Sequence, residues 1–152
     1  MAWLADNTSR TDDARVFSSS ASKLRTAINS LLWDEALGAY ADSRDAGLLL
    51  GNATRQTNAL AVICGLIDLD DAKKESITRF FAGTDPEDVK TAFLNFYVAM
   101  ALFELGAVED ALTLVRRYWG EMVARGATSF VEVDAAAASA EVEFIQNGLL
   151  GG

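Results

Sequence analysis

Histidine is absent from this chain, and cysteine occurs only once among its 152 residues. Without histidine, Ser-His and Cys-His nucleophile systems and ordinary histidine-containing zinc sites are excluded. The lone Cys64 cannot form a disulfide within the chain, and its apolar setting, AVICGLI, predicts a small buried core residue. Any catalysis is therefore left to carboxylates, tyrosine, lysine or Cys64, and we expect no metal and no cofactor.

Basic residues are also scarce, with 13 Lys and Arg against 22 Asp and Glu, a net charge of −9. This balance argues against a nucleic-acid partner and against an anionic membrane surface. No apolar stretch reaches the roughly 18 residues of a membrane span. The N-terminal sequence MAWLADNTSRTDD does not have the pattern of a signal peptide, so we expect a cytoplasmic protein. A neutral polar ligand such as a sugar is compatible with this charge.

A single proline and a hydrophobic content of 51%, much of it alanine, favour an all-α fold. Apolar residues recur with the period of a helix, and glycines follow most of the periodic segments. We interpret the acidic cluster at residues 68–71 as the start of a helix and not as a metal site. The predicted helices span residues 13–33, 54–68, 71–82, 91–105 and 108–125.

The predicted helices are of two kinds. Those at 54–68 and 91–105 are apolar on nearly every side, which is typical of buried helices, and we expect 91–105 to be the most buried. The other three have one apolar face, formed in the first helix by Phe17, Ala21, Leu24, Ile28 and Leu31. This alternation predicts a double layer of antiparallel helical hairpins with the apolar helices inside.

Two further segments complete the organisation of the chain. The glycine-containing connection from Asp34 to Asn52 includes GAYADS, which could form a short strand or turn. Residues 134–152 are rich in alanine and end in Gly-Gly, which indicates a low-complexity tail. We therefore divide the chain into a helical-hairpin domain, residues 1–133, and this tail.

Four segments between residues 31 and 132 resemble, in the same order, motifs of the six-hairpin glycosidases of the α-L-rhamnosidase type. That family folds as a barrel of six helical hairpins with its active site at one end. The resemblance implies that this chain forms part of such a barrel, a partial (α/α)6 toroid. The segments are LLWDEALGAYADS, RQTNALAVICGLID, FLNFYVAMALFELG and RYWGEMVARGATSFVE.

The resemblance also implies hydrolysis of a terminal rhamnose-like sugar by two carboxylates with inversion at the anomeric carbon. Glu132 takes the position of the general base, and the adjacent Phe130 is the candidate for contact with the sugar. Gln56 and Asn58 begin the second helix, where they either face the barrel mouth and bind substrate or cap the helix. Val131 stands where the family usually carries Trp, and no segment resembles the motif of the general acid. We therefore expect the isolated chain to be inactive.

A different function class remains open, namely a non-catalytic helical module that packs against another protein. Part of a barrel leaves its apolar inner helices without partners on one side, and exposed apolar patches normally mark interfaces. We expect the chain to associate with itself through the helices at 54–68 and 91–105, or with a complementary helical fragment. The tail could instead fold back and cover part of this surface.

Overall fold

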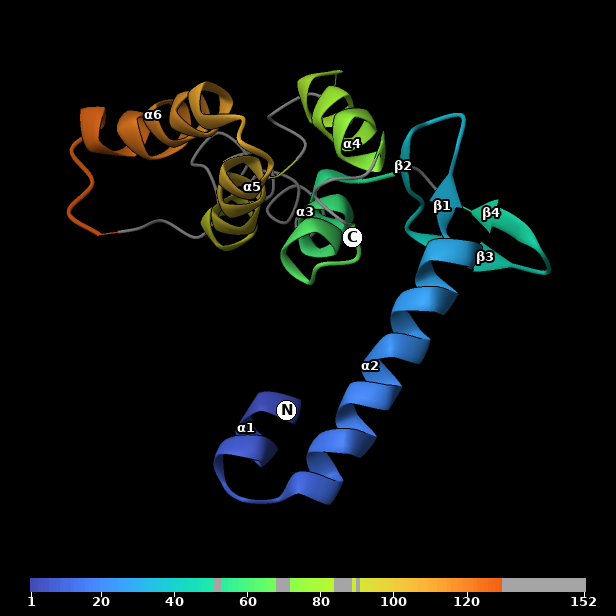
Figure 1. Ribbon diagram of the computed structural model, residues 1–152. Helices are drawn as coiled ribbons and strands as arrows, with labels where there is room; N and C mark the ends of the chain where they lie inside the picture. Colours follow the sequence, from blue (N-terminus) through green and yellow to red (C-terminus); the bar gives the residue numbers. More distant parts are fainter. Residues whose placement is uncertain (51–52, 68–71, 84–88, 90, 130–152) are drawn as a thin grey trace, which may run out of the picture.

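The computed structural model describes residues 1–50, 53–67, 72–83, 89 and 91–129 (Figure 1). In this part of the chain, helices dominate and the strands are few and short, so the predicted all-α class is confirmed. The described helices are α1 (Ala2–Asn7), α2 (Thr11–Leu31), α3 (Arg55–Ile63), α4 (Ala72–Gly83), α5 (Ala92–Leu105) and α6 (Val108–Ala124).

Local sequence signals set the limits of the two central helices. Thr54 and Thr91 precede α3 and α5, and each side-chain oxygen accepts a hydrogen bond from the backbone N–H three residues later. α5 ends at Gly106, whose φ of 81° is left-handed. α3 ends at Ile63, earlier than predicted, because Gly65 adopts a φ of 64° and turns the chain.

Two small β-hairpins fill the connection between α2 and α3. The expected short strand within GAYADS is present as β2 and the start of β3, and the second hairpin turns through Ala46 and Gly47, both with positive φ. The strands are β1 (Trp33–Asp34) paired with β2 (Ala39–Tyr40), and β3 (Ser43–Asp45) paired with β4 (Leu48–Leu50), both antiparallel.

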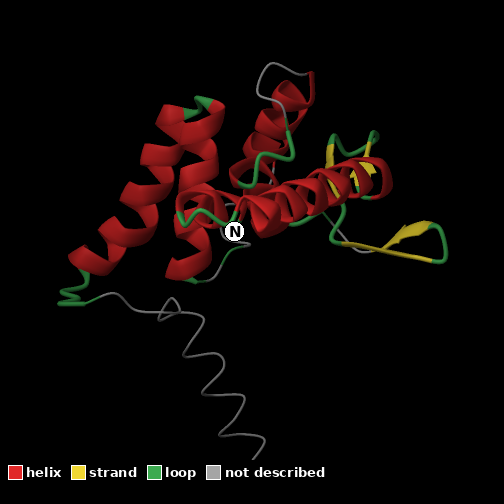
Figure 2. Cartoon of the chain, turned by 60° about the horizontal axis from the view of Figure 1, so that its bottom comes forward, coloured by secondary structure: helices red, strands yellow, loops and turns green. Residues whose placement is uncertain are grey.

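The hydrophobic core lies where α3 packs along α5, with α4, α6 and β2 around this pair (Figure 2). Tyr40, Ile77 and Val98 are its largest fully buried apolar side chains. We call this assembly of α3–α6 and the hairpins the body. None of the helices in the described part of the chain is long and apolar enough to cross a membrane.

The two central helices are less enclosed than the sequence predicts. On α5, Asn95, Val98 and Leu102 face the core, but Phe96 and Phe103 are 53% and 46% exposed. The prediction that 91–105 is buried on all sides is therefore wrong. On α3, Leu60 and Cys64 are exposed, so the buried position expected for Cys64 is also wrong. Cys64 follows the last helical residue, directly before the turn at Gly65, and this places it at the surface.

The N-terminal helices form a protruding arm. α2 leaves the body at β1 and extends away from it, and α1 packs back against the far end of α2 (Figure 1). None of the residues of α2 is fully buried. We expected the apolar face of α2 to pack inward. Instead, Phe17, Leu24 and Leu31 on this face are at least one-third exposed, and of its apolar residues Ile28 packs against the core.

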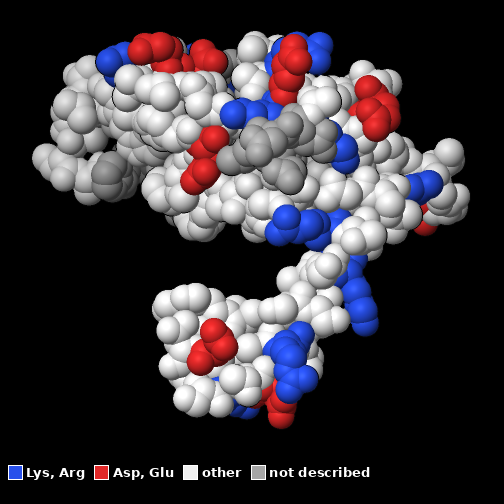
Figure 3. All heavy atoms as spheres, in the orientation of Figure 1, with Lys and Arg blue, Asp and Glu red and all other residues white. Residues whose placement is uncertain are grey.

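Asn29 anchors the body end of α2. Its side chain donates to the Leu66 carbonyl at 2.9 Å. It accepts hydrogen bonds from the Tyr40 hydroxyl at 2.8 Å and the Lys73 ammonium at 3.0 Å. α2 contains no glycine or proline at which it could bend. A space separates the free end of the arm from the body (Figure 3).

Candidate functional site

The segment that leads to the predicted catalytic residue is described up to Ser129. α6 ends at Ala124, and Gly126 adopts a φ of 80°, which is the helix stop that the sequence predicts. Phe130 and Glu132 lie outside the described residues. Their roles as sugar contact and general base therefore stay predictions.

Asn58 is buried in the body and holds the first hairpin to α3. Its side-chain oxygen accepts a hydrogen bond from the Tyr40 N–H at 2.8 Å, and its amide group donates to the carbonyls of Tyr40 and Thr54 at 3.1 and 2.9 Å. With an exposure of 0%, Asn58 offers no surface to a ligand in this arrangement. Gln56 is half-buried in the first turn of α3. A substrate contact by Gln56 stays a prediction.

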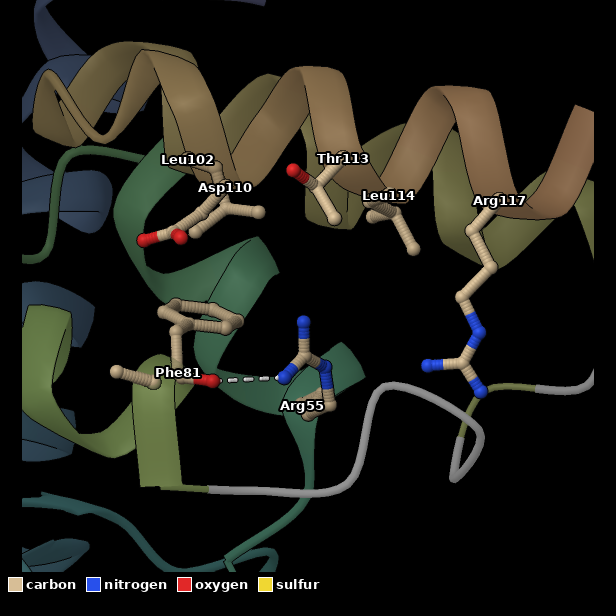
Figure 4. A pocket seen from close by; sticks show the side chains of 8 residues that line it. Arg55, Phe81, Leu102, Asp110, Thr113, Leu114 and Arg117 are labelled. Carbon is tan, nitrogen blue, oxygen red and sulfur yellow. Dashed lines mark hydrogen bonds between the residues drawn. The ribbon is translucent and has the colours of Figure 1, made fainter. Parts of the chain in front are cut away.

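A polar pocket lies between α3, the end of α4, α5 and α6 (Figure 4). Arg55, only 4% exposed, donates a hydrogen bond to the Phe81 carbonyl at 2.8 Å and lies over the Phe81 ring at 5.3 Å. Asp110, Thr113 and Arg117 project from one face of α6 toward the same space. Two guanidinium groups, a carboxylate and a hydroxyl are donors and acceptors suited to a polyhydroxylated or anionic group.

The size of this pocket limits what it can hold. Its volume is about 160 Å³, below the range of roughly 300–1,000 Å³ typical of small-molecule sites. By itself it accommodates a small polar group and not an oligosaccharide. This pocket could not be predicted from the sequence, because Arg55 and the face of α6 are far apart along the chain.

A larger apolar groove runs between α5 and α6. Its volume is about 600 Å³, within the range of ligand sites, but apart from the indole N–H of Trp119 the described residues that line it are apolar and do not orient a sugar. The groove is formed by Ala92, Phe93, Phe96, Ala99, Met100, Phe103, Val115 and Trp119. Its composition is typical of a surface for another apolar element.

Four aromatic residues of types that can stack on sugars, Trp33, Tyr40, Tyr118 and Trp119, are mostly structural in this fold. Tyr40 is 1% exposed, and its ring meets that of Trp33 edge to face at 5.0 Å. The Lys73 ammonium lies 4.5 Å from the Trp33 ring centre, a cation–π contact that ties α4 to the first hairpin. Tyr118 and Trp119 are half-buried and contact each other, and Trp119 also lines the apolar groove.

Among the described residues, no group of three or more Cys, Asp or Glu could hold a metal ion. The acidic cluster at 68–71 lies outside the described residues. Exposed ion pairs such as Arg125 with Glu121 at 3.2 Å join neighbouring turns of one helix and contribute little to stability.

Comparison with known proteins finds similarity among solved structures. No family model matches the sequence, and no curated protein matches it. Among solved structures, a GH78 family rhamnosidase of Bacillus sp. GL1 superposes with a TM-score of 0.74 and 28% sequence identity over 87% of this chain. The chain spans 14% of the length of that enzyme. The resemblance predicted from the order of the motifs is confirmed, and the chain has a rhamnosidase-like helical fold that corresponds to part of a glycoside hydrolase.

Proposed function

We propose that this chain serves as part of the catalytic helical barrel of a glycoside hydrolase that acts on terminal rhamnose-like sugars. The observation that carries the proposal is the similarity in fold and sequence to the GH78 rhamnosidase. The net charge of −9 suits a neutral substrate better than a polyanionic one. This role is compatible with the cytoplasmic location expected from the sequence, which stays a prediction.

In this proposal Glu132 is the general base of an inverting reaction. It takes a proton from a water that attacks the anomeric carbon, while a second carboxylic acid protonates the departing glycosidic oxygen. Phe130 and Gln56 contribute to sugar contact. No segment of the chain resembles the motif that supplies the acid, so we expect no enzymatic turnover by the chain alone.

Activity and binding can be tested separately. The chain should not hydrolyse an aryl α-L-rhamnoside above the uncatalysed rate, and turnover abolished by Glu132→Gln would contradict the expected inactivity. In NMR titrations, L-rhamnose should shift the amide resonances of residues near Phe130, and Phe130→Ala should remove these shifts. Phe93→Ala, in the apolar groove, should leave them unchanged. An absence of shifts with the unmodified chain would argue against a sugar site here.

The second candidate function is a non-catalytic helical module that binds another protein. The observation that favours it is the row of exposed apolar side chains on α5, where Phe93, Phe96 and Phe103 are 65%, 53% and 46% exposed. A folded chain with no affinity for sugar that forms a stoichiometric protein complex would support this alternative.

A further inference from the structure

The pocket between α3 and α6 has a buried floor and an exposed rim. Arg55 of α3 belongs to the floor, and it is only 4% exposed. The rim is formed by three side chains of α6 that are all exposed to solvent, those of Asp110, Thr113 and Arg117. A small molecule can therefore reach the floor directly from solvent.

The fold holds Arg55 in place before any ligand binds. Its guanidinium donates to the Phe81 carbonyl at 2.8 Å and lies 5.3 Å from the centre of the Phe81 ring. A guanidinium has five N–H donors and stays charged in proteins, so one bond to a carbonyl does not exhaust what it can offer to the pocket. A charged group that is already ordered binds an anion at a lower entropic cost than a mobile one.

The rim presents a negative group at one end and a positive group at the other. Asp110, Thr113 and Arg117 are spaced by three and four residues, so they lie on one face of α6. Asp110 and Arg117 are two helical turns apart, about 10 Å along the axis. Figure 4 shows Arg55 reaching the pocket between them, opposite the Thr113 hydroxyl.

The rest of the lining is apolar and strengthens the effect of these charges. Leu102 and Leu114 are buried, and Ala82 and the Phe81 ring complete the wall. Charges interact more strongly beside groups of low polarity than in water. A charged group in this pocket therefore interacts more strongly with the two arginines than it would on an open helix surface.

Size and charge together select the ligand. The volume of about 160 Å³ is the space of roughly five water molecules in the liquid, which is too little for a sugar ring. Two guanidinium groups against one carboxylate give the lining a net charge of +1, so a singly charged anion is favoured over a doubly charged one. The planar guanidinium matches a carboxylate, and Asp110 can accept a hydrogen bond from a hydroxyl group.

We propose that this pocket binds a small hydroxycarboxylate of about the size of glycolate. Its carboxylate group lies between Arg55 and Arg117, and its hydroxyl group donates a hydrogen bond to Asp110. This binding does not depend on the proposed role in a glycoside hydrolase, because it uses none of the residues assigned there to the sugar or to catalysis.

NMR titration of the full chain at constant ionic strength tests the choice of ligand. Glycolate should shift the amide resonances of Thr113 and Leu114 in a saturable way. Acetate should bind about tenfold more weakly, because it lacks the hydroxyl group that Asp110 accepts. Inorganic phosphate carries more negative charge at pH 7 and should also bind more weakly than glycolate, because Asp110 repels the additional charge.

Matched variants test the site itself. Arg117→Gln should weaken glycolate binding at least about tenfold, because it removes a charge-assisted hydrogen bond. Arg116→Gln is its control, since it removes the same charge from the adjacent exposed position and should leave binding unchanged. Asp110→Ala should abolish the preference for glycolate over acetate, whereas Glu109→Ala, in the same helical turn, should retain it. Circular dichroism should show that all four variants remain helical.

Three results would overturn the proposal. The first is the absence of a saturable shift with glycolate. The second is an equal loss of binding in Arg116→Gln and Arg117→Gln, which would indicate a general attraction of anions to the basic side chains of α6. The third is acetate or phosphate that binds as tightly as glycolate, which would remove the role given to Asp110.

Discussion

The body and the arm are built from amphipathic helices with similar apolar spacing, yet their surroundings differ in kind. In the body, α5 presents Val98 and Leu102 to α3 and α6, and both side chains are almost completely buried. In the arm, the apolar face of α2 meets α1 and the edge of the body, and Leu24 stays exposed. An apolar period thus predicts that a helix forms but not what that helix packs against. α5 shows the same contrast between its two faces, because the face with Val98 is buried and the face with Phe96 is exposed.

The largest expected effect lies in the body. Ile77 on α4 is 0% exposed, so Ile77→Ala should lower the free energy of unfolding by about 2–5 kcal/mol. Urea denaturation followed by circular dichroism measures this change. A loss below about 1 kcal/mol would mean that α4 does not belong to the cooperative core.

Asn58→Ala should have the next largest effect. It leaves the buried N–H and carbonyl of Tyr40 without the hydrogen bonds from Asn58, at a cost of about 1–3 kcal/mol for each group left unsatisfied. Hydrogen exchange should show faster exchange at Tyr40. Asn58→Asp keeps the acceptor for the Tyr40 N–H but places a carboxylate at a fully buried position facing two carbonyl oxygens, so it should be at least as damaging as Asn58→Ala.

Phe96→Ala tests the open face of α5. A fully buried phenylalanine would cost about 3–5 kcal/mol on truncation, but Phe96 is 53% exposed, and we expect about 1–2 kcal/mol at protein concentrations where the chain is monomeric. Urea denaturation followed by circular dichroism measures this change. A cost of about 3–5 kcal/mol would mean that Phe96 is enclosed far more completely than its exposure indicates.

The smallest effect is expected in the arm. Leu24→Ala should change the stability of the monomer by less than about 0.5 kcal/mol, as is usual for exposed positions. The measurement is the thermal unfolding midpoint of Leu24→Ala at low protein concentration, compared with that of Ile77→Ala. The difference between the two variants then measures how differently the arm and the body contribute to stability. A large destabilisation in the monomer would show that the arm packs against its own body.

The parts of the fold that were predictable are those determined locally. Thr91 and Gly106 mark the ends of α5, and the alternation in GAYADS anticipates β2, because caps and turns depend on a few adjacent residues. Burial was less predictable, since it depends on elements distant in the sequence. Cys64 appeared to belong to the core, and the direction of α2 could not be read from its periodicity.

The candidate site was predictable to a similar extent. The order of the motifs identified the rhamnosidase-like fold, and the helix stop at Gly126 was recognisable from glycine alone. The pocket was not, because it unites Arg55 of α3 with Asp110 and Arg117 of α6, which are distant in the sequence. The structural role of Asn58 had no distinct signal in the sequence, because Asn58 is one of several polar residues at positions 54–58 that precede the apolar part of the helix.

The anchoring of α2 through Asn29 has a mechanical consequence. With a rise of about 1.5 Å per residue, the 18 residues between Thr11 and Asn29 make a lever roughly 27 Å long. A tilt of about 10° at Asn29 would move the far end by about 5 Å, close to the pitch of one helical turn. Three hydrogen bonds of this one side chain, to Tyr40, Leu66 and Lys73, join α2 to the body, while a fourth goes to Arg25 within α2. A small tilt at this pivot would therefore move the tip of the arm sideways by nearly the length of one helical turn.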